Sequence, residues 1–196
     1  MTSGPSARLF VAIDPPEKVC EELAAWARSA VLELGTVGGK TSPVRVLDPE
    51  LLHLTLCFLG NRPAEEITAI EEALEECAGG VGELTIGAPV WLPPRRPRAL
   101  AVEVRDDAEG GLQALHEMLV PALTRACGYA EERRRFRAHV TLARMREGPR
   151  GRARERVLRP TPALSFTPAS VVLYRSWLSP AGASYEALAK RTLLPA

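Results

Sequence analysis

The sequence reads His-Leu-Thr-Leu at residues 53–56 and His-Val-Thr-Leu at residues 139–142, so one short motif occurs twice. The chain has three histidines, and two of them belong to this motif. Each copy lies in an apolar run, residues 51–59 and 136–143, that predicts a β-strand. Because side chains alternate between the faces of a strand, each histidine should share a face with the threonine two residues later.

Two such strands around one cleft would bring two imidazoles and two hydroxyl groups to the same small volume. An imidazole titrates near neutrality, so one histidine can donate a proton while the other accepts one. A single histidine on a strand is more often structural, but repetition with threonine at the same offset favours catalysis. The repeated motif therefore predicts a site for phosphate chemistry.

The repeat extends beyond the two motifs. Each half starts with an expected strand followed by an amphipathic helix, and each half continues through its motif strand to a closing strand. Only the first half adds a clear second helix, with apolar residues at Ile67, Ile70, Leu74 and Cys77. The expected strands are 8–14, 51–59, 83–92, 98–104, 136–143 and 164–178, the expected helices are 17–34 and 109–127, and the stretch 150–158 is short and arginine-rich.

This alternation of elements predicts an α+β fold with mostly antiparallel sheets. We expect two lobes, related by a pseudo-twofold axis, to flank a central cleft in which the motif strands meet. The whole chain, 1–196, is expected to form one bilobal domain, with an internal repeat of roughly 8–92 and 98–178. Because both half-sites lie in one chain, a monomer is sufficient.

The composition is that of an ordinary globular protein, with 46% apolar residues, 25% charged residues and a formal net charge of +1. Arginine is concentrated between residues 133 and 159, around the second motif. This concentration predicts a positively charged rim of the site that attracts a phosphodiester chain. The widely spaced cysteines at 20, 57, 77 and 127 are expected to be buried, reduced thiols. No apolar stretch approaches the length of a membrane span, and a cytoplasmic location is expected.

These residues carry a family resemblance. The chain resembles the two-histidine phosphoesterase superfamily, and within it the bacterial RNA 2′,3′-cyclic phosphodiesterases, historically called 2′–5′ RNA ligases. The resemblance covers essentially the whole chain through five blocks in order: RLFVAIDPP, LLHLTLCFLG, PRALAVEV, FRAHVTLAR and SVVLYRSWLSPAGASYEAL. The sequence departs from the family's pattern at Ala138, where proline is common, and in a long loop at 35–43.

The resemblance implies hydrolysis of RNA 2′,3′-cyclic phosphate ends to 2′-phosphate ends, without a metal or another cofactor. It implies that His53 donates a proton to the leaving O3′ and that His139 accepts one from water. Thr55 and Thr141 would bind the phosphoryl oxygens, and Arg144 is a candidate phosphate ligand. Phe10 and Tyr185 are weaker candidates for lining the nucleotide pocket.

Two other functions stay open on the sequence alone. ATP-independent formation of 2′–5′ RNA linkages is the reverse of the same chemistry, and it would require an RNA 5′-hydroxyl in place of water. A nucleotide-binding module without turnover would have no need of a matched acid and base. The expected partner is RNA with a cyclic phosphate terminus, either a tRNA fragment or another oligonucleotide.

Three further features of the sequence favour no additional site. The motif histidines lack carboxylate or cysteine neighbours at the spacing of metal ligands. The glycine-rich stretch 35–41 has the wrong spacing for a phosphate-binding P-loop and follows a helix, so no ATP site is expected. His116 lies in an apolar helical stripe without a threonine partner, and we expect it to be structural.

Overall fold

The fold is α+β, as the sequence predicts. The computed structural model describes residues 5–33, 44–77, 79–106, 110–131, 135–145, 158–179 and 182–194. The elements in chain order are β1 (Ser6–Ile13), α1 (Glu17–Glu33), β2 (Val44–Val46), the 3₁₀-helix η1 (Pro49–Leu51), β3 (Leu54–Pro63), η2 (Ala64–Glu66), α2 (Ile67–Glu75), β4 (Leu84–Leu92), β5 (Ala99–Asp106), α3 (Gly111–Cys127), β6 (His139–Met145), β7 (Ser165–Phe166), β8 (Ser170–Ser179) and β9 (Gly182–Thr192).

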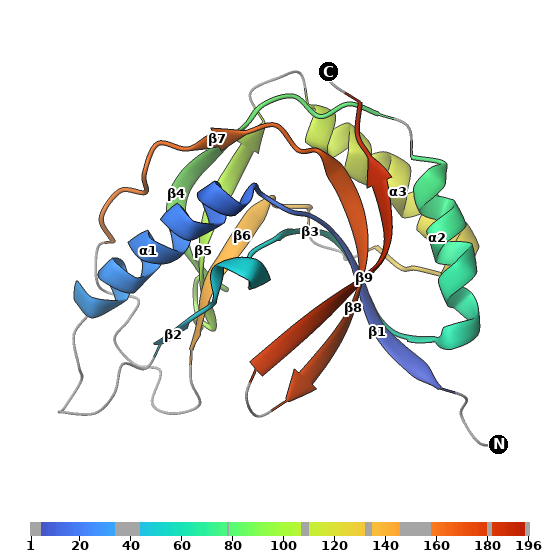
Figure 1. Cartoon of the computed structure of the whole chain (residues 1–196), viewed down its shortest axis with the longest axis horizontal. Helices are drawn as coiled ribbons and strands as arrows, with labels where there is room; N and C mark the ends of the chain where they lie inside the picture. The colour runs from blue at the N-terminus through green and yellow to red at the C-terminus, as the bar shows by residue number, and fades with distance from the viewer. Residues whose placement is uncertain are drawn as a thin grey trace.

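The nine strands of the described residues form one curled sheet, and every pairing between them is antiparallel (Figure 1). Their order is β7-β4-β5-β6-β3-β1-β8-β9, with β2 paired to β6. The motif strands β3 and β6 are neighbours at the centre of this order. On one side β5 lies between β4 and β6, and on the other β1 lies between β8 and β3. The expected internal repeat and its boundaries stay a prediction.

The strand order mixes the two halves of the chain. Strand β4 precedes the second half in sequence but pairs with β5, and β8 comes near the end of the chain but pairs with β1. Each side of the central junction therefore contains strands from both halves. The two expected lobes are joined through β3 and β6, which share a single registered pair, Leu54 with Val140.

Several expected strand limits were wrong. The turn η1 occupies residues 49–51, so His53 precedes β3 instead of lying inside a strand from 51 to 59. Strand β6 starts at His139, and residues 136–138 are not part of it. The single strand expected over 164–178 is two strands, β7 and β8, because residues 167–169 break the ladder.

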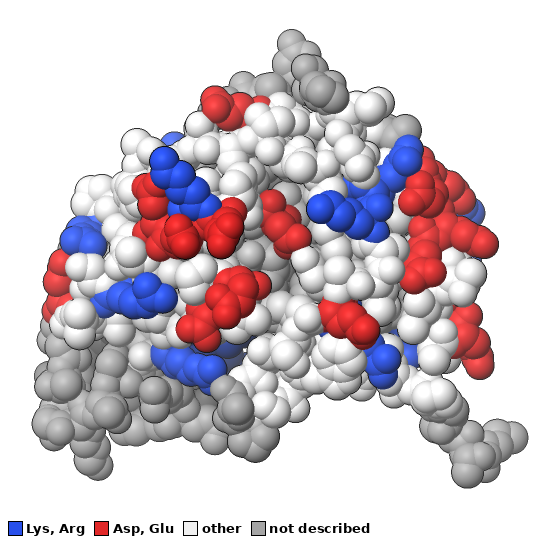
Figure 2. Space-filling model, viewed as in Figure 1, with Lys and Arg blue, Asp and Glu red and all other residues white. Residues whose placement is uncertain are grey.

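The helices cover the sheet with the apolar stripes that the sequence predicts. Helix α1 buries Val19, Leu23, Trp26 and Ala30 and contacts β2 and β6, whereas α3 contacts β3 and α2 (Figure 1). Helix α3 ends at Cys127 and is capped by Gly128, whose φ of 62° is the left-handed conformation that glycine adopts easily at a helix end. The polar face of α2 is solvated, and Figure 2 shows acidic side chains gathered over it.

The cysteines are buried and free, in agreement with the sequence analysis. Burial raises the pKa of the Cys20 thiol to about 11 and that of the Cys57 thiol to about 12. Thiols with such values are protonated near neutral pH and therefore poorly nucleophilic. They act as small apolar side chains of the core.

Two expectations concern residues outside the described part of the chain. These are the loop at 35–43, with its glycine-rich stretch, and most of the arginine-rich stretch 150–158. Among the described helices, none is both long and apolar enough to cross a membrane.

Candidate active site

The two copies of the motif meet at the junction of β3 and β6. Leu54 and Val140 are register partners, and both side chains are fully buried. Continuing this antiparallel register sets His53 opposite Thr141 and Thr55 opposite His139. Because these four residues alternate with Leu54 and Val140, they share the opposite face of the sheet, and all four are half-buried. The motif residues thus lie together, as the sequence predicts.

Both motif histidines are held by the same kind of contact, a hydrogen bond from Nδ1 to the backbone carbonyl two residues earlier. The Nδ1 atom of His53 lies 2.9 Å from the Leu51 carbonyl oxygen, and Nδ1 of His139 lies 2.8 Å from the Arg137 carbonyl oxygen. A carbonyl oxygen only accepts hydrogen bonds, so Nδ1 must be the donor in each contact. The Nε2 atom of each ring is left to exchange a proton with another molecule.

His53 lies in a more enclosed environment than an ordinary surface histidine. Its ring centroid is 4.8 Å from that of Phe10 and 5.2 Å from that of Tyr185. Burial lowers the pKa of His53 below the ordinary value of 6.5, and the positive charges of Arg144 and His139 act in the same direction. The Leu51 carbonyl and the Asp14 carboxylate oppose this lowering. The free site therefore favours the neutral form of His53.

A cavity of about 850 Å³ opens beside His53 and Thr55. Arg144, Phe10 and Tyr185 line it, so these three predicted site residues do lie around one space. His139 and Thr141 are not among its lining residues and lie on the neighbouring strand. The other lining residues are Arg8, Arg45, Leu47, Leu51, Phe58, Met145, Ser176, Leu178, Ser179, Gly182 and Ala183.

The positive charges of the arginines in this cavity exceed the negative charges that the described residues place beside them. In the described part of the chain, Arg8, Arg45 and Arg144 make no ion pair with a carboxylate. Arg45 is the register partner of Arg144 across β2 and β6. Like charges directly opposite each other on a sheet are destabilising, and a bound anion between them removes that cost. The cavity is thus suited to a phosphate group.

Arg8 and Arg45 line the cavity but were not among the site residues predicted from the sequence. Arg8 alternates with Leu9 and so lies on the face of β1 that also carries Phe10, a signal that was available in the sequence. Arg45 lies on the short strand β2, which no sequence pattern predicted. Its guanidinium reaches the start of β9, where a Cβ added at Gly182 would lie 2.7 Å from its Nη2 atom.

His116 lies away from the motif residues, on α3. Its side chain is buried and its ring stacks on Phe136, with centroids 4.3 Å apart. Within the described ranges, no group of three or more His, Cys, Asp or Glu side chains is arranged to hold a metal ion.

This arrangement agrees with comparisons to known proteins. A family model described as the 2′-5′ RNA ligase superfamily matches residues 15–177, most of the chain. The chain belongs to the 2′-5′ RNA ligase superfamily. The match spans both copies of the motif and both strands that carry them.

Relatives of this superfamily member include proteins named RNA 2′,3′-cyclic phosphodiesterase. The one from Thermus thermophilus is 30% identical, over 95% of this chain and 90% of its own length. The one from Archaeoglobus fulgidus is 31% identical, over 71% of this chain and 73% of its own length. The one from Escherichia coli is 32% identical, over 70% of this chain and 71% of its own length.

Solved structures of the superfamily share the fold. The crystal structure of TT0787 of Thermus thermophilus has a TM-score of 0.77 and 26% identity, covering 96% of this chain and 98% of that one. The structure of Escherichia coli LigT complexed with 3′-AMP also has a TM-score of 0.77, with 25% identity and coverage of 96% and 99%. The likeness extends over nearly the whole of each chain.

Proposed function

We propose that this protein hydrolyses 2′,3′-cyclic phosphate ends of RNA to 2′-phosphate ends. The observation that carries the proposal is the pair of identically held histidines, each with a threonine, next to a cavity lined by three arginines. The names of the relatives support the same reaction.

In the proposed mechanism, the Nε2 atom of His139 takes a proton from water as the water oxygen attacks phosphorus. The bond between phosphorus and O3′ breaks, and His53 donates its Nε2 proton to O3′. The product has a 2′-phosphate and a free 3′-hydroxyl, and proton exchange with solvent restores both rings. Each histidine contributes general acid or base catalysis of the kind that typically accelerates a reaction by about 10²- to 10⁴-fold.

The charge that develops on the phosphoryl oxygens needs donors fixed in advance. Thr55 and Thr141 supply hydroxyl groups from both central strands, and Arg144 supplies a guanidinium from the end of β6. We infer that Phe10 and Tyr185, which enclose His53, also form the wall against which the terminal nucleoside lies. Arg8 and Arg45 would neutralise further negative charge on the substrate.

His53 must be protonated to act as the acid, although burial lowers its pKa in the free site. A bound cyclic phosphate is an anion, and a nearby negative charge favours the imidazolium form. Substrate binding would therefore bring His53 to the protonated state that the reaction needs.

This pH behaviour is testable. In the free protein, the His53 ring should titrate below 6.5, and 2′-AMP, which mimics the product, should raise its midpoint. Tyr185→Ala should also raise the midpoint in the free protein, because opening the site reduces the desolvation that lowers the pKa. NMR titration of the histidine ring signals measures all three values. A free-state midpoint at or above 6.5, or one insensitive to 2′-AMP, is inconsistent with the account.

The arginines of the cavity provide a second prediction. Replacing Arg45 or Arg144 with glutamine should raise KM for a cyclic phosphate substrate by about tenfold or more, because hydrogen bonds to charged groups contribute roughly 1.5–3 kcal/mol. Neither change should lower the free energy of unfolding, since each relieves repulsion between two like charges. The matched control is Arg28→Gln on the exposed face of α1. An unchanged KM in both variants would remove the arginines from the phosphate site.

The experiment that tests the proposed function uses a short RNA ending in a 2′,3′-cyclic phosphate, incubated with the protein in EDTA. The expected product is a 2′-phosphate terminus, with no loss of rate on chelation. A cyclic end that persists on several RNAs would favour the nucleotide-binding module. Joined RNAs in the presence of a 5′-hydroxyl strand would favour ligation.

The finer expectations about location and assembly are also proposals. One chain contains both histidines of the site, so we infer that a monomer is sufficient for activity. Buried free thiols fit a reducing compartment such as the cytoplasm.

A further inference from the structure

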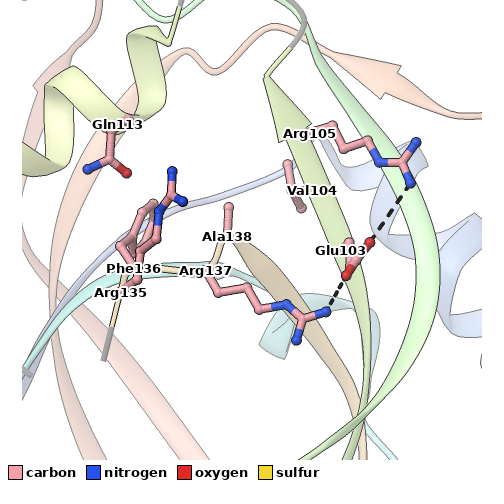
Figure 3. A pocket seen from close by; sticks show the side chains of 8 residues that line it. All are labelled: Glu103, Val104, Arg105, Gln113, Arg135, Phe136, Arg137 and Ala138. Carbon is pink, nitrogen blue, oxygen red and sulfur yellow. Dashed lines mark hydrogen bonds and ion pairs between the residues drawn. The ribbon is translucent and has the colours of Figure 1, made fainter. Parts of the chain in front are cut away.

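A second cavity, of about 420 Å³, shares no lining residue with the 850 Å³ cavity (Figure 3). Strand β5, helix α3 and the segment before β6 form its walls. The lining residues are Glu103, Val104, Arg105, Gln113, Arg135, Phe136, Arg137 and Ala138. The mechanism above uses none of these side chains.

One wall of this cavity lies on the face of the sheet that carries the motif residues. Glu103 is the register partner of His139 across β5 and β6, and partners in an antiparallel pair project to the same face. A Cβ added at Gly87 would lie 3.1 Å from Cβ of Glu103 and 3.2 Å from Nε of Arg105, so Arg105 projects to that face too. Arg105 is two residues beyond Glu103, about 7 Å farther along the strand than the level of His139.

Positive charge exceeds negative charge in this cavity. Arg105 and Arg137 approach Glu103 from two sides, as Figure 3 shows, and share its single carboxylate. The Arg105 contact is long, at 3.9 Å, and that side chain is 64% exposed, so the pair contributes little to stability. Arg135 is exposed and has no ion-pair partner among the described residues. The three arginines and one glutamate give this cavity a net positive charge, which would attract a second anion.

The wall of the cavity is also anchored. Phe136 stacks on the buried His116 ring, and the Arg137 carbonyl accepts the hydrogen bond from His139 Nδ1. The segment that carries Arg135 and Arg137 is thereby fixed relative to the proposed catalytic base. A ligand held by these arginines would have a defined position relative to the reacting phosphate.

We propose that this cavity binds the phosphodiester group of the RNA strand next to the cyclic end. The inference rests on the proposed function and makes it more specific, because a cyclic mononucleotide has no second phosphate to place there. Arg105 and Arg135 supply the free guanidinium groups, and Arg137 closes the site beside His139. The protein should then prefer an oligonucleotide end over a cyclic mononucleotide.

The test compares a 2′,3′-cyclic mononucleotide with a trinucleotide that ends in the same cyclic nucleotide. The variants are Arg105→Gln, Arg135→Gln and their combination, with Arg28→Gln as an exposed-arginine control that lines neither cavity. In the double variant, kcat/KM for the trinucleotide should fall about fivefold or more. For the mononucleotide it should stay within about twofold, because the replaced groups touch only the second phosphate. The salt dependence of kcat/KM for the trinucleotide should also become shallower.

The outcomes separate this inference from the function on which it rests. Equal effects on the two substrates, or a wild-type protein without preference for the trinucleotide, would overturn the second phosphate site while leaving hydrolysis intact. Failure of the wild-type protein to open either cyclic phosphate would defeat the proposed function itself. Both replaced arginines are exposed, so the variants should fold.

Discussion

Replacing either His53 or His139 with alanine should lower kcat for opening a 2′,3′-cyclic phosphate by about 10²- to 10⁴-fold. Each variant removes one of the two groups that move a proton, and no other histidine in the chain is placed to substitute for it. KM should change much less, because the threonines and arginines that hold the phosphate remain. Single-turnover assays on a cyclic-phosphate RNA measure the chemical step separately from product release.

The two losses should not add. When an acid and a base act in one step, removing the second costs little once the first is gone, so the double variant should resemble the slower single variant. Arg28→Gln is the control, since Arg28 lies on the exposed face of α1 and lines neither cavity. A near-normal rate in either motif variant would show that the pair is not the catalytic device.

The largest effect on stability is expected from Leu54→Ala. Leu54 is fully buried and is the residue through which β3 is registered with Val140 of β6. Removing three carbons from such a site typically costs about 2–5 kcal/mol, because the surroundings collapse only partly into the space left behind. The free energy of unfolding, obtained from denaturant titration, should fall by that amount.

Leu32→Ala provides the control, because Leu32 on α1 is 78% exposed and its truncation should change stability by less than about 0.5 kcal/mol. Activity adds a second measurement for Leu54→Ala. The side chain supports the strands that hold His53 and His139, so kcat should fall at temperatures where the variant is still folded. Equal stability losses in the two leucine variants would mean that the junction is not a rigid part of the core.

The sequence predicted the centre of the fold because that centre is periodic. The strict alternation around Leu54 and Val140 predicted a buried face and an opposite face that carries the motif residues, and the structure has both. The helical stripes of α1 and α3 were equally visible, since apolar residues recur at helical spacing in both. These local patterns depend only on which side of an element is buried.

The parts that the sequence missed depend on contacts between distant segments. Strand β9 is paired along its whole length with β8, yet its side chains alternate weakly because much of it is half-buried or exposed. Strand β2 has three residues and exists because β6 offers it an edge. The position of Arg45 in the site follows from that pairing, so no local pattern could reveal it.

The environment of His53 could not be predicted from the sequence either. Phe10 and Tyr185 are far apart along the chain, and the successive pairings of β3 with β1, of β1 with β8 and of β8 with β9 bring both rings to the same imidazole. The sequence identified the titratable group but gave no direction for its pKa. That direction depends on burial, which the assembled sheet creates.

The roles of His53 and His139 can be separated with a substrate in which sulfur replaces the bridging O3′ of the cyclic phosphate. A thiolate leaves without protonation, so this substrate needs the base but not the acid. The sulfur substitution should therefore restore most of the rate lost in His53→Ala and leave His139→Ala slow. Rescue of His139→Ala alone, or equal rescue of the two variants, would contradict the assignment of His53 as acid and His139 as base.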